Sequence, residues 1–266
     1  MDQDLQDIAN KIIKYLDQKN IQYCDVRADQ QIKNSALIEN NDIEYIKNNE
    51  NKGIGVRLIK NGTWSFCSIT NPNSFDKIKN ILDNTIKNLD YKNIKNKKIK
   101  LHSNPANKRE INFPVLKKTD IEELIKTGLE CNKIISSTPK IIKSITHASH
   151  TTNSKYFVNS EGSEILQNFT DVIMEMVATA HESGQTQSVN ITEGGRGGLE
   201  LITNKIQQSA KEISKKASEL IYAKPVKEEK ATVVMNPDFV SLLTHEILGH
   251  PSEADRVLGK EMAWAG

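Results

Sequence analysis

The sequence lacks any long apolar run. No stretch of its 266 residues reaches the roughly 18 consecutive apolar residues that a membrane-spanning helix needs. The first residues, 1–10, are acidic with helical spacing, unlike the basic start and apolar core of a secretory signal. We therefore expect a cytoplasmic protein that is neither secreted nor embedded in a membrane.

Cysteine and aromatic residues are also scarce. Cys24, Cys67 and Cys131 are odd in number and show no Cys-x-x-Cys spacing, which argues against a disulfide framework and against a zinc ribbon. Aromatic residues make up 5% of the chain, so its cores must be mainly aliphatic. The net charge is only +2, from 36 Lys and Arg against 34 Asp and Glu, which excludes the strongly basic and acidic classes of chain.

The first third of the chain predicts an α+β unit. Apolar residues recur every three or four positions over 2–19 and again over 73–89, which is typical of amphipathic helices. Between them, residues 23–70 contain β-prone runs separated by turn signals such as Asn61-Gly62, which indicates a small antiparallel sheet. We predict an N-terminal α+β domain over residues 1–91.

Residues 92–118 are strongly basic. The segment contains nine Lys and Arg residues but only one acidic residue, Glu110, and Pro105 and Pro114 interrupt any helix. We expect a solvated linker. The alternative is a nucleic-acid adaptor that places these cations on phosphates, although the segment lacks interleaved aromatic residues.

A second α+β domain is predicted over residues 119–230. The pattern indicates a helix over 119–136, strands over 140–191 with a hairpin turn at 159–162, and a helix of about twenty residues after the glycine cluster 194–198. Residues 171–180 fit a strand or a helix, and we favour a strand. The glycine cluster is either a turn or substrate-facing loop, or an anion cradle at the helix start. Arg196 within it is a candidate substrate contact.

The chemistry of the sequence is concentrated near its end. Residues 232–235 have the composition of a short buried strand, and the helix predicted after them carries His245-Glu246-Ile247-Leu248-Gly249-His250. Neutral imidazoles are good zinc ligands, and a carboxylate beside the first histidine can take a proton from metal-bound water. The alternative is a capped helix end, at which histidines near the C-terminus interact favourably with the helix dipole.

The spacing of the two histidines predicts a distorted helix. Five residues correspond to 500° on a regular α-helix, which leaves the two imidazoles about 140° apart. A π-bulge, with its i→i+5 hydrogen bonds, would bring them together, and Pro251 prevents the helix from continuing normally. We therefore predict a π-bulge or a helix end at this motif.

The motif and its surroundings resemble the signature of the TldD/PmbA family, also called modulator of DNA gyrase or peptidase U62. The residues concerned are HEILGHPSEADRVLGKEMAWAG at the end of the chain, with Glu-x-Asp after the second histidine, and the Gly-Gly-Arg-Gly-Gly-Leu-Glu stretch at 194–200. The layout of the whole chain agrees, from the N-terminal α+β unit to the start of an incomplete metallopeptidase domain at 231–266.

The resemblance implies a zinc-dependent peptidase that acts on small or unfolded peptides. His245 and His250 would bind Zn²⁺, Glu246 would activate water, and Glu253 and Asp255 would have supporting or structural duties. A paralogous PmbA/TldE-like subunit, or a second copy of the chain, would be the partner.

The resemblance also implies a third zinc ligand, a cysteine, beyond Gly266. We therefore expect a truncated chain that binds zinc weakly and is inactive alone, unless Glu253, Asp255 or Glu261 completes the site. The competing hypothesis is a non-catalytic regulatory or partner subunit.

Overall fold

The chain forms two compact units. The computed structural model describes residues 1–91, 101–102, 104–202 and 205–257. Its contacts separate Met1–Ala223 from Lys224–Gly266, and each unit is described by itself. Among the helices of the described residues, none is long and apolar enough to cross a membrane.

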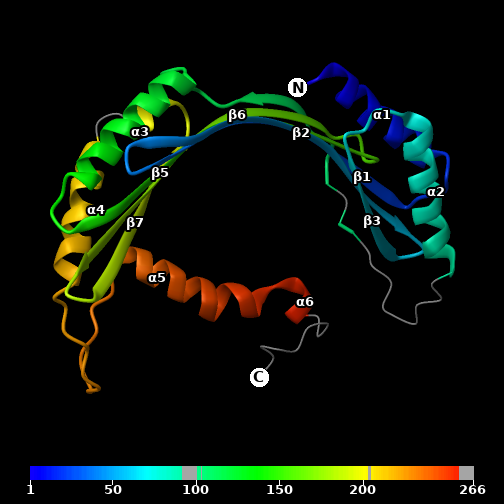
Figure 1. Cartoon of the computed structure of the whole chain (residues 1–266). Helices are drawn as coiled ribbons and strands as arrows, with labels where there is room; N and C mark the ends of the chain where they lie inside the picture. Colours follow the sequence, from blue (N-terminus) through cyan, green and yellow to red (C-terminus); the bar gives the residue numbers. More distant parts are fainter. Residues whose placement is uncertain (92–100, 103, 203–204, 258–266) are drawn as a thin grey trace. The chain divides into compact units, whose positions relative to one another are not determined.

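The first unit combines one seven-stranded sheet with α-helices (Figure 1). The elements in chain order are α1 (Gln3–Asp17), β1 (Tyr23–Glu39), β2 (Asp42–Lys60), β3 (Thr63–Thr70), α2 (Phe75–Tyr91), β4 (Lys108–Asn112), α3 (Ile121–Ser136), β5 (Ile141–Asn159), β6 (Glu164–Glu182), β7 (Gln185–Arg196), a 3₁₀ turn (Leu199–Leu201) and α4 (Ile206–Leu220). The predicted α+β class is confirmed, and residues 171–180 are strand, as favoured.

The strands from both halves of the sequence join in a single sheet. Their order is β3-β2-β1-β5-β6-β4, and β7 pairs with β6 beside β4. β1 pairs antiparallel with β5 over its length, so the sheet runs without a break from the first predicted domain into the second. The expected linker contains β4, which pairs parallel with β6. The sequence pattern did not predict β4. Residues 92–100 and 103 of that linker lie outside the described residues.

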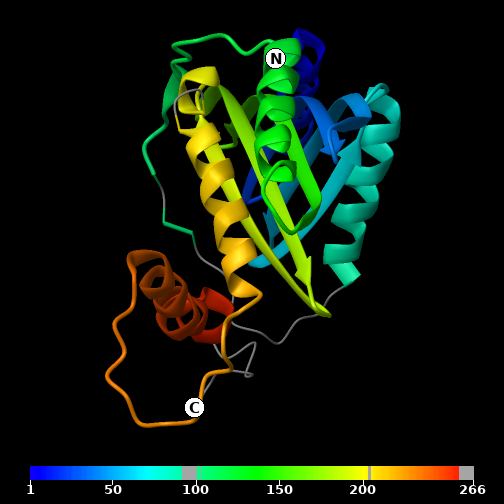
Figure 2. The ribbon, with the colours of Figure 1, turned by 60° about the vertical axis from the view of Figure 1, so that its left-hand side comes forward.

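The sheet is arched, and helices cover its outer face at both ends (Figure 1). One apolar core lies under α1 and α2, and a second lies under α3 and α4. Figure 2 shows α3 and α4 side by side against the strands. Between the cores, β1 is polar from Gln30 to Ser35 except for Ile32, yet its backbone stays paired with β2 and β5. This continuous pairing makes the strands longer than the short runs predicted from the sequence.

A buried amide fixes α3 to the sheet. Asn132 is fully buried, and its Nδ2 donates to the carbonyl of Ile38 (3.3 Å) and to Oγ1 of Thr146 (3.2 Å). Its Oδ1 accepts from the backbone N–H of Asn41 (2.8 Å) and from Oγ of Ser144 (2.9 Å). The side chain therefore fills its hydrogen-bonding capacity and joins a helix, a β-turn and two strands.

The glycine cluster has a structural position that the sequence did not indicate. Gly194 lies in β7 directly against β6, where a Cβ would come within 2.0 Å of the carbonyl oxygen of Val172. The expected twenty-residue helix is shorter, with 15 residues beginning at Ile206, so the cluster does not form a cradle at its start. Instead, the carboxylate of Glu200 accepts backbone N–H groups of Gly198 (2.8 Å) and Lys117 (2.8 Å), and its pKa falls to about 2 mainly because of the Gly198 bond.

The second unit has no regular secondary structure over residues 224–236, and its helical turns begin at Pro237. It contains α5 (Pro237–Thr244), a π-helical turn (His245–Gly249), a 3₁₀ turn (His250–Ser252) and α6 (Ala254–Val257). The buried strand predicted at 232–235 is wrong, because this segment has no regular secondary structure and Val234 is 93% exposed. A strand needs a neighbour to bond its backbone groups, and no strand of the described residues pairs with it.

Candidate metal centre

The helix that carries the motif starts at a well-formed cap. Oδ1 of Asn236 accepts the backbone N–H of Phe239 at 2.9 Å, and Pro237 occupies the first turn, where its missing N–H costs nothing. The cap therefore fixes the residue at which α5 begins.

The helix changes from α to π geometry at His245. The backbone N–H of His250 donates to the carbonyl of His245, a bond of the i→i+5 type, and residues 245–249 form a π-turn. The predicted π-bulge is confirmed. The two imidazole rings lie with centroids 4.5 Å apart and planes at 78°, so the five-residue spacing brings them to one side of the turn.

His245, Glu246 and His250 converge. One ligand atom from each lies within 4.8 Å of the others, and Oε2 of Glu246 is 3.8 Å from Nε2 of His250. Among the described residues, this is the group of three His, Cys, Asp or Glu side chains close enough to share a metal ion. Two imidazole nitrogens and one carboxylate are donors that suit zinc.

Glu253 lies within hydrogen-bond distance of the second histidine. Its Oε1 lies 2.8 Å from Nδ1 of His250, and a carboxylate can only accept, so in the neutral ring Nδ1 carries the proton and Nε2 presents a lone pair. Arg256, which the sequence analysis did not single out, has its Nε 3.5 Å from Oε2 of Glu253. The i,i+3 spacing of opposite charges could have indicated this pair.

The other candidate residues of this region lie apart from the three converging side chains. Asp255 accepts the backbone N–H of Arg256 at 3.0 Å and is not in the group. Glu261 lies outside the described residues. Within the first unit, Nε of Arg196 is 3.4 Å from Oδ1 of Asp171, and its guanidinium lies 3.9 Å from the ring centroid of Phe169. Arg196 is therefore held by its own neighbours on the sheet.

The three cysteines belong to the first unit. Cys24 and Cys131 are buried in its two cores, and burial raises the pKa of their thiols to about 11 and about 12. Burial also raises the pKa of Cys67. Thiols that stay protonated are poor metal ligands.

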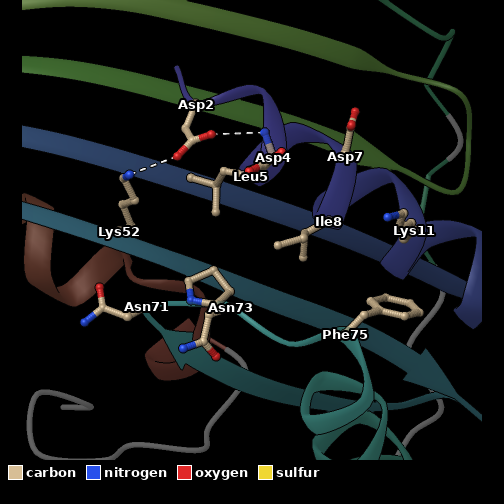
Figure 3. A pocket seen from close by; sticks show the side chains of 11 residues that line it. Asp2, Asp4, Leu5, Asp7, Ile8, Lys11, Lys52, Asn71, Asn73 and Phe75 are labelled. Carbon is tan, nitrogen blue, oxygen red and sulfur yellow. Dashed lines mark hydrogen bonds and ion pairs between the residues drawn. The ribbon is translucent and has the colours of Figure 1, made fainter.

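An open hollow of about 560 Å³ lies beside the N-terminus of α1 (Figure 3). Two of its charged groups are engaged with each other, since Asp2 caps the N–H of Asp4 (3.0 Å) and pairs with Lys52 (2.9 Å). The hydrogen bond from Lys52 lowers the pKa of Asp2. We assign these contacts to the attachment of α1 to β2.

Comparison with known proteins places the chain in a family. The family model described as PmbA/TldA metallopeptidase domain 1 matches residues 24–89, and the one described as the central domain matches residues 114–223. A metalloprotease of Methanocaldococcus jannaschii is 30% identical over 241 residues, which cover 89% of this chain and 52% of the relative. A zinc metalloprotease TldD homolog of Saccharolobus solfataricus is 25% identical over 251 residues, or 93% of this chain and 54% of the relative.

Solved structures share the fold. A Thermotoga maritima protein named as a modulator of DNA gyrase superposes with a TM-score of 0.65 at 12% identity, over 84% of this chain and 50% of that one. TldE from Thermococcus kodakarensis gives 0.63 at 15% identity, over 79% and 47%. The chain spans about half the length of the curated relatives it matches. From both family domains and these relatives, the chain belongs to the TldD/PmbA family of metallopeptidases.

Proposed function

We propose that the chain carries the zinc-binding and water-activating residues of a peptidase that acts on small or unfolded peptides. His245 and His250 hold the ion through imidazole nitrogens, and Glu246 takes the proton of the attacking water. Zinc bound there supplies a lowered water pKa and polarises the scissile carbonyl. Glu253 keeps the His250 ring oriented for binding.

The observation that carries the proposal is the π-turn at 245–249. A regular α-helix would separate histidines five residues apart, whereas the π-turn places both beside Glu246. Oε2 of Glu246 lies 3.8 Å from Nε2 of His250, close enough for the carboxylate to take a proton from water bound between the two histidines. The curated relatives, named as metalloproteases, support the same activity.

Paired substitutions test the roles. In the chain extended to the length of its relatives, Glu246→Gln should keep zinc and lose hydrolysis of an unfolded casein substrate, while His245→Ala should lose both. Zinc is measured by mass spectrometry after purification without added metal. Full activity in Glu246→Gln would refute its role, and zinc retained in His245→Ala would refute the ligand assignment.

We also propose a TldE-like paralogous subunit, or a second copy, as partner. The similarity of the chain to the fold of TldE over 79% of its length supports this choice. Light scattering of the extended chain with and without a TldE-like protein should show a complex larger than the monomer. The nucleic-acid alternative gains no specific support, since the described part of the basic segment includes β4, which pairs with β6.

A further inference from the structure

Asp25 is a buried carboxylate between two arginines on the sheet. Its side chain is 0% exposed, whereas those of Arg27 and Arg57 are 48% and 42% exposed. Successive side chains of a strand point to opposite faces, and Cys24 and Val26 pack in the core beneath α1. Asp25 and Arg27 therefore project from the face that α1 and α2 do not cover.

The shared carboxylate holds both guanidinium groups in place. Arg57 lies directly opposite Asp25 in the pairing of β1 with β2, and donates to Oδ2 from Nε (3.0 Å) and Nη2 (2.8 Å). Nη1 of Arg27 donates to Oδ1. A guanidinium has five N–H donors, so Nη1 of Arg57 and Nε and Nη2 of Arg27 have donors beyond these bonds. The two arginines are thus ordered before any ligand arrives.

Aromatic rings flank the pair. The guanidinium of Arg27 lies 5.1 Å from the ring centroid of Phe157, and that of Arg57 lies 5.4 Å from Trp64. Phe66 stands opposite Arg57 in the pairing of β2 with β3 and remains 61% exposed. The cations therefore border an accessible apolar surface.

The charge of this cluster selects the class of ligand. Two guanidinium groups and one carboxylate leave a net charge of +1, which matches one carboxylate better than a phosphate dianion or a polyanion. On the same face, Lys155 and Arg196 are each paired with an aspartate, so they provide no continuous cationic path for a nucleic acid.

We propose that Arg27 and Arg57 bind a carboxylate of a peptide, while Phe66 contacts the apolar side chain beside that carboxylate. The peptide class of ligand rests on the proposed function. The site itself lies in the first unit and is tested by peptide binding. Loss of this proposal can therefore be distinguished from loss of the proposed peptidase activity, which is tested by hydrolysis.

The test compares three peptides on the ¹⁵N-labelled chain. N-acetyl-Ala-Ala-Phe with a free carboxylate is titrated against its C-terminal amide and against N-acetyl-Glu-Ala-Phe-amide, which moves the carboxylate to a side chain. Arginine Nε–H signals report binding by NMR. Losing a charge-assisted hydrogen bond should weaken binding by about tenfold or more, so the free acid should bind that much more tightly than the amide. The glutamate peptide has no apolar side chain beside its carboxylate and should bind less tightly than the free acid, and equal binding of the two would overturn the role of Phe66.

Variants separate recognition from folding. Arg27→Gln and Arg57→Gln should each weaken the free acid by about tenfold, and Arg27→Lys less, because it keeps charge but loses the planar fork. Lys155→Gln is the matched control on the same face and should bind as the wild type does. Thermal unfolding confirms that each variant is folded.

Three outcomes would overturn the proposal. They are equal binding of acid and amide, unchanged binding in both glutamine variants, and tighter binding of inorganic phosphate or of a single-stranded oligothymidylate through the same arginines. Repeating the titration in Glu246→Gln keeps the peptide intact, so the result does not depend on hydrolysis.

Discussion

The contact between Glu253 and His250 leads to a quantitative prediction for zinc affinity. Oε1 of Glu253 is 2.8 Å from Nδ1 of His250, and this bond fixes both the tautomer and the rotation of the ring. Removing it leaves His250 able to turn away and to carry its proton on Nε2, the nitrogen that faces Glu246. We therefore expect Glu253→Ala to weaken zinc binding without removing a ligand.

The expected size follows from the exposure of the pair. Loss of a partner that orients a metal-binding histidine costs about 10- to 100-fold in affinity, or about 1.4–2.8 kcal/mol. The side chains of His250 and Glu253 are 33% and 44% exposed, so solvent screens the interaction and the lower end of that range applies. Glu253→Gln, which keeps a neutral acceptor, should lose less than Glu253→Ala.

A competition titration against a fluorescent zinc chelator measures the affinity. Asp255→Asn is the matched control, because Asp255 bonds only a neighbouring backbone N–H among the described contacts and should leave zinc binding unchanged. Wild-type affinity in Glu253→Ala would refute the orienting role. A loss as large as that of His250→Ala would instead make Glu253 a direct ligand.

Three further predictions concern the first unit. Asn132→Ala should destabilise it by about 2–6 kcal/mol, because four hydrogen bonds lose their partner at about 0.5–1.5 kcal/mol each. Urea unfolding followed by circular dichroism measures the change. Glu200 has a folded pKa of about 2 against 4.5 normally, so its contribution to stability is complete above pH 4.5 and is lost as the pH falls toward 2. The melting temperature of Glu200→Gln should therefore depend less on pH between 4.5 and 2 than that of the wild type. The same pH dependence in both proteins would contradict this. Cys24 and Cys131, with pKa values of about 11 and 12, should react with a thiol reagent at pH 8 only after unfolding. Rapid labelling of either of these two residues in the native chain, located by peptide mass spectrometry, would show that the cores open.

The local structure of this chain was largely predictable from its sequence. Apolar spacing identified the four long helices of the first unit, and Asn61-Gly62 identified a hairpin turn whose residues adopt φ of 54° and 72°. The five-residue spacing in HEILGH also predicted the π-turn, because that distortion is a property of the helix alone.

The sequence could not show which distant segments pair. The polar middle of β1, such as Gln31 and Asn34, has no apolar alternation, and only its pairing with β2 and β5 keeps it extended. The prediction for residues 232–235 is wrong for the opposite reason. They have the composition of a strand, but no strand of the described residues pairs with them.

The sequence by itself determined that His245, Glu246 and His250 lie close together, because their spacing along one helix sets their separation. Only the tertiary structure decided that Asp25, Arg27 and Arg57 form a cluster. Their meeting depends on the register of β1 against β2, and a shift of one residue would send these side chains to opposite faces of the sheet. Contacts within one turn follow from helix geometry, whereas contacts across strands follow from pairing that many weak interactions select together.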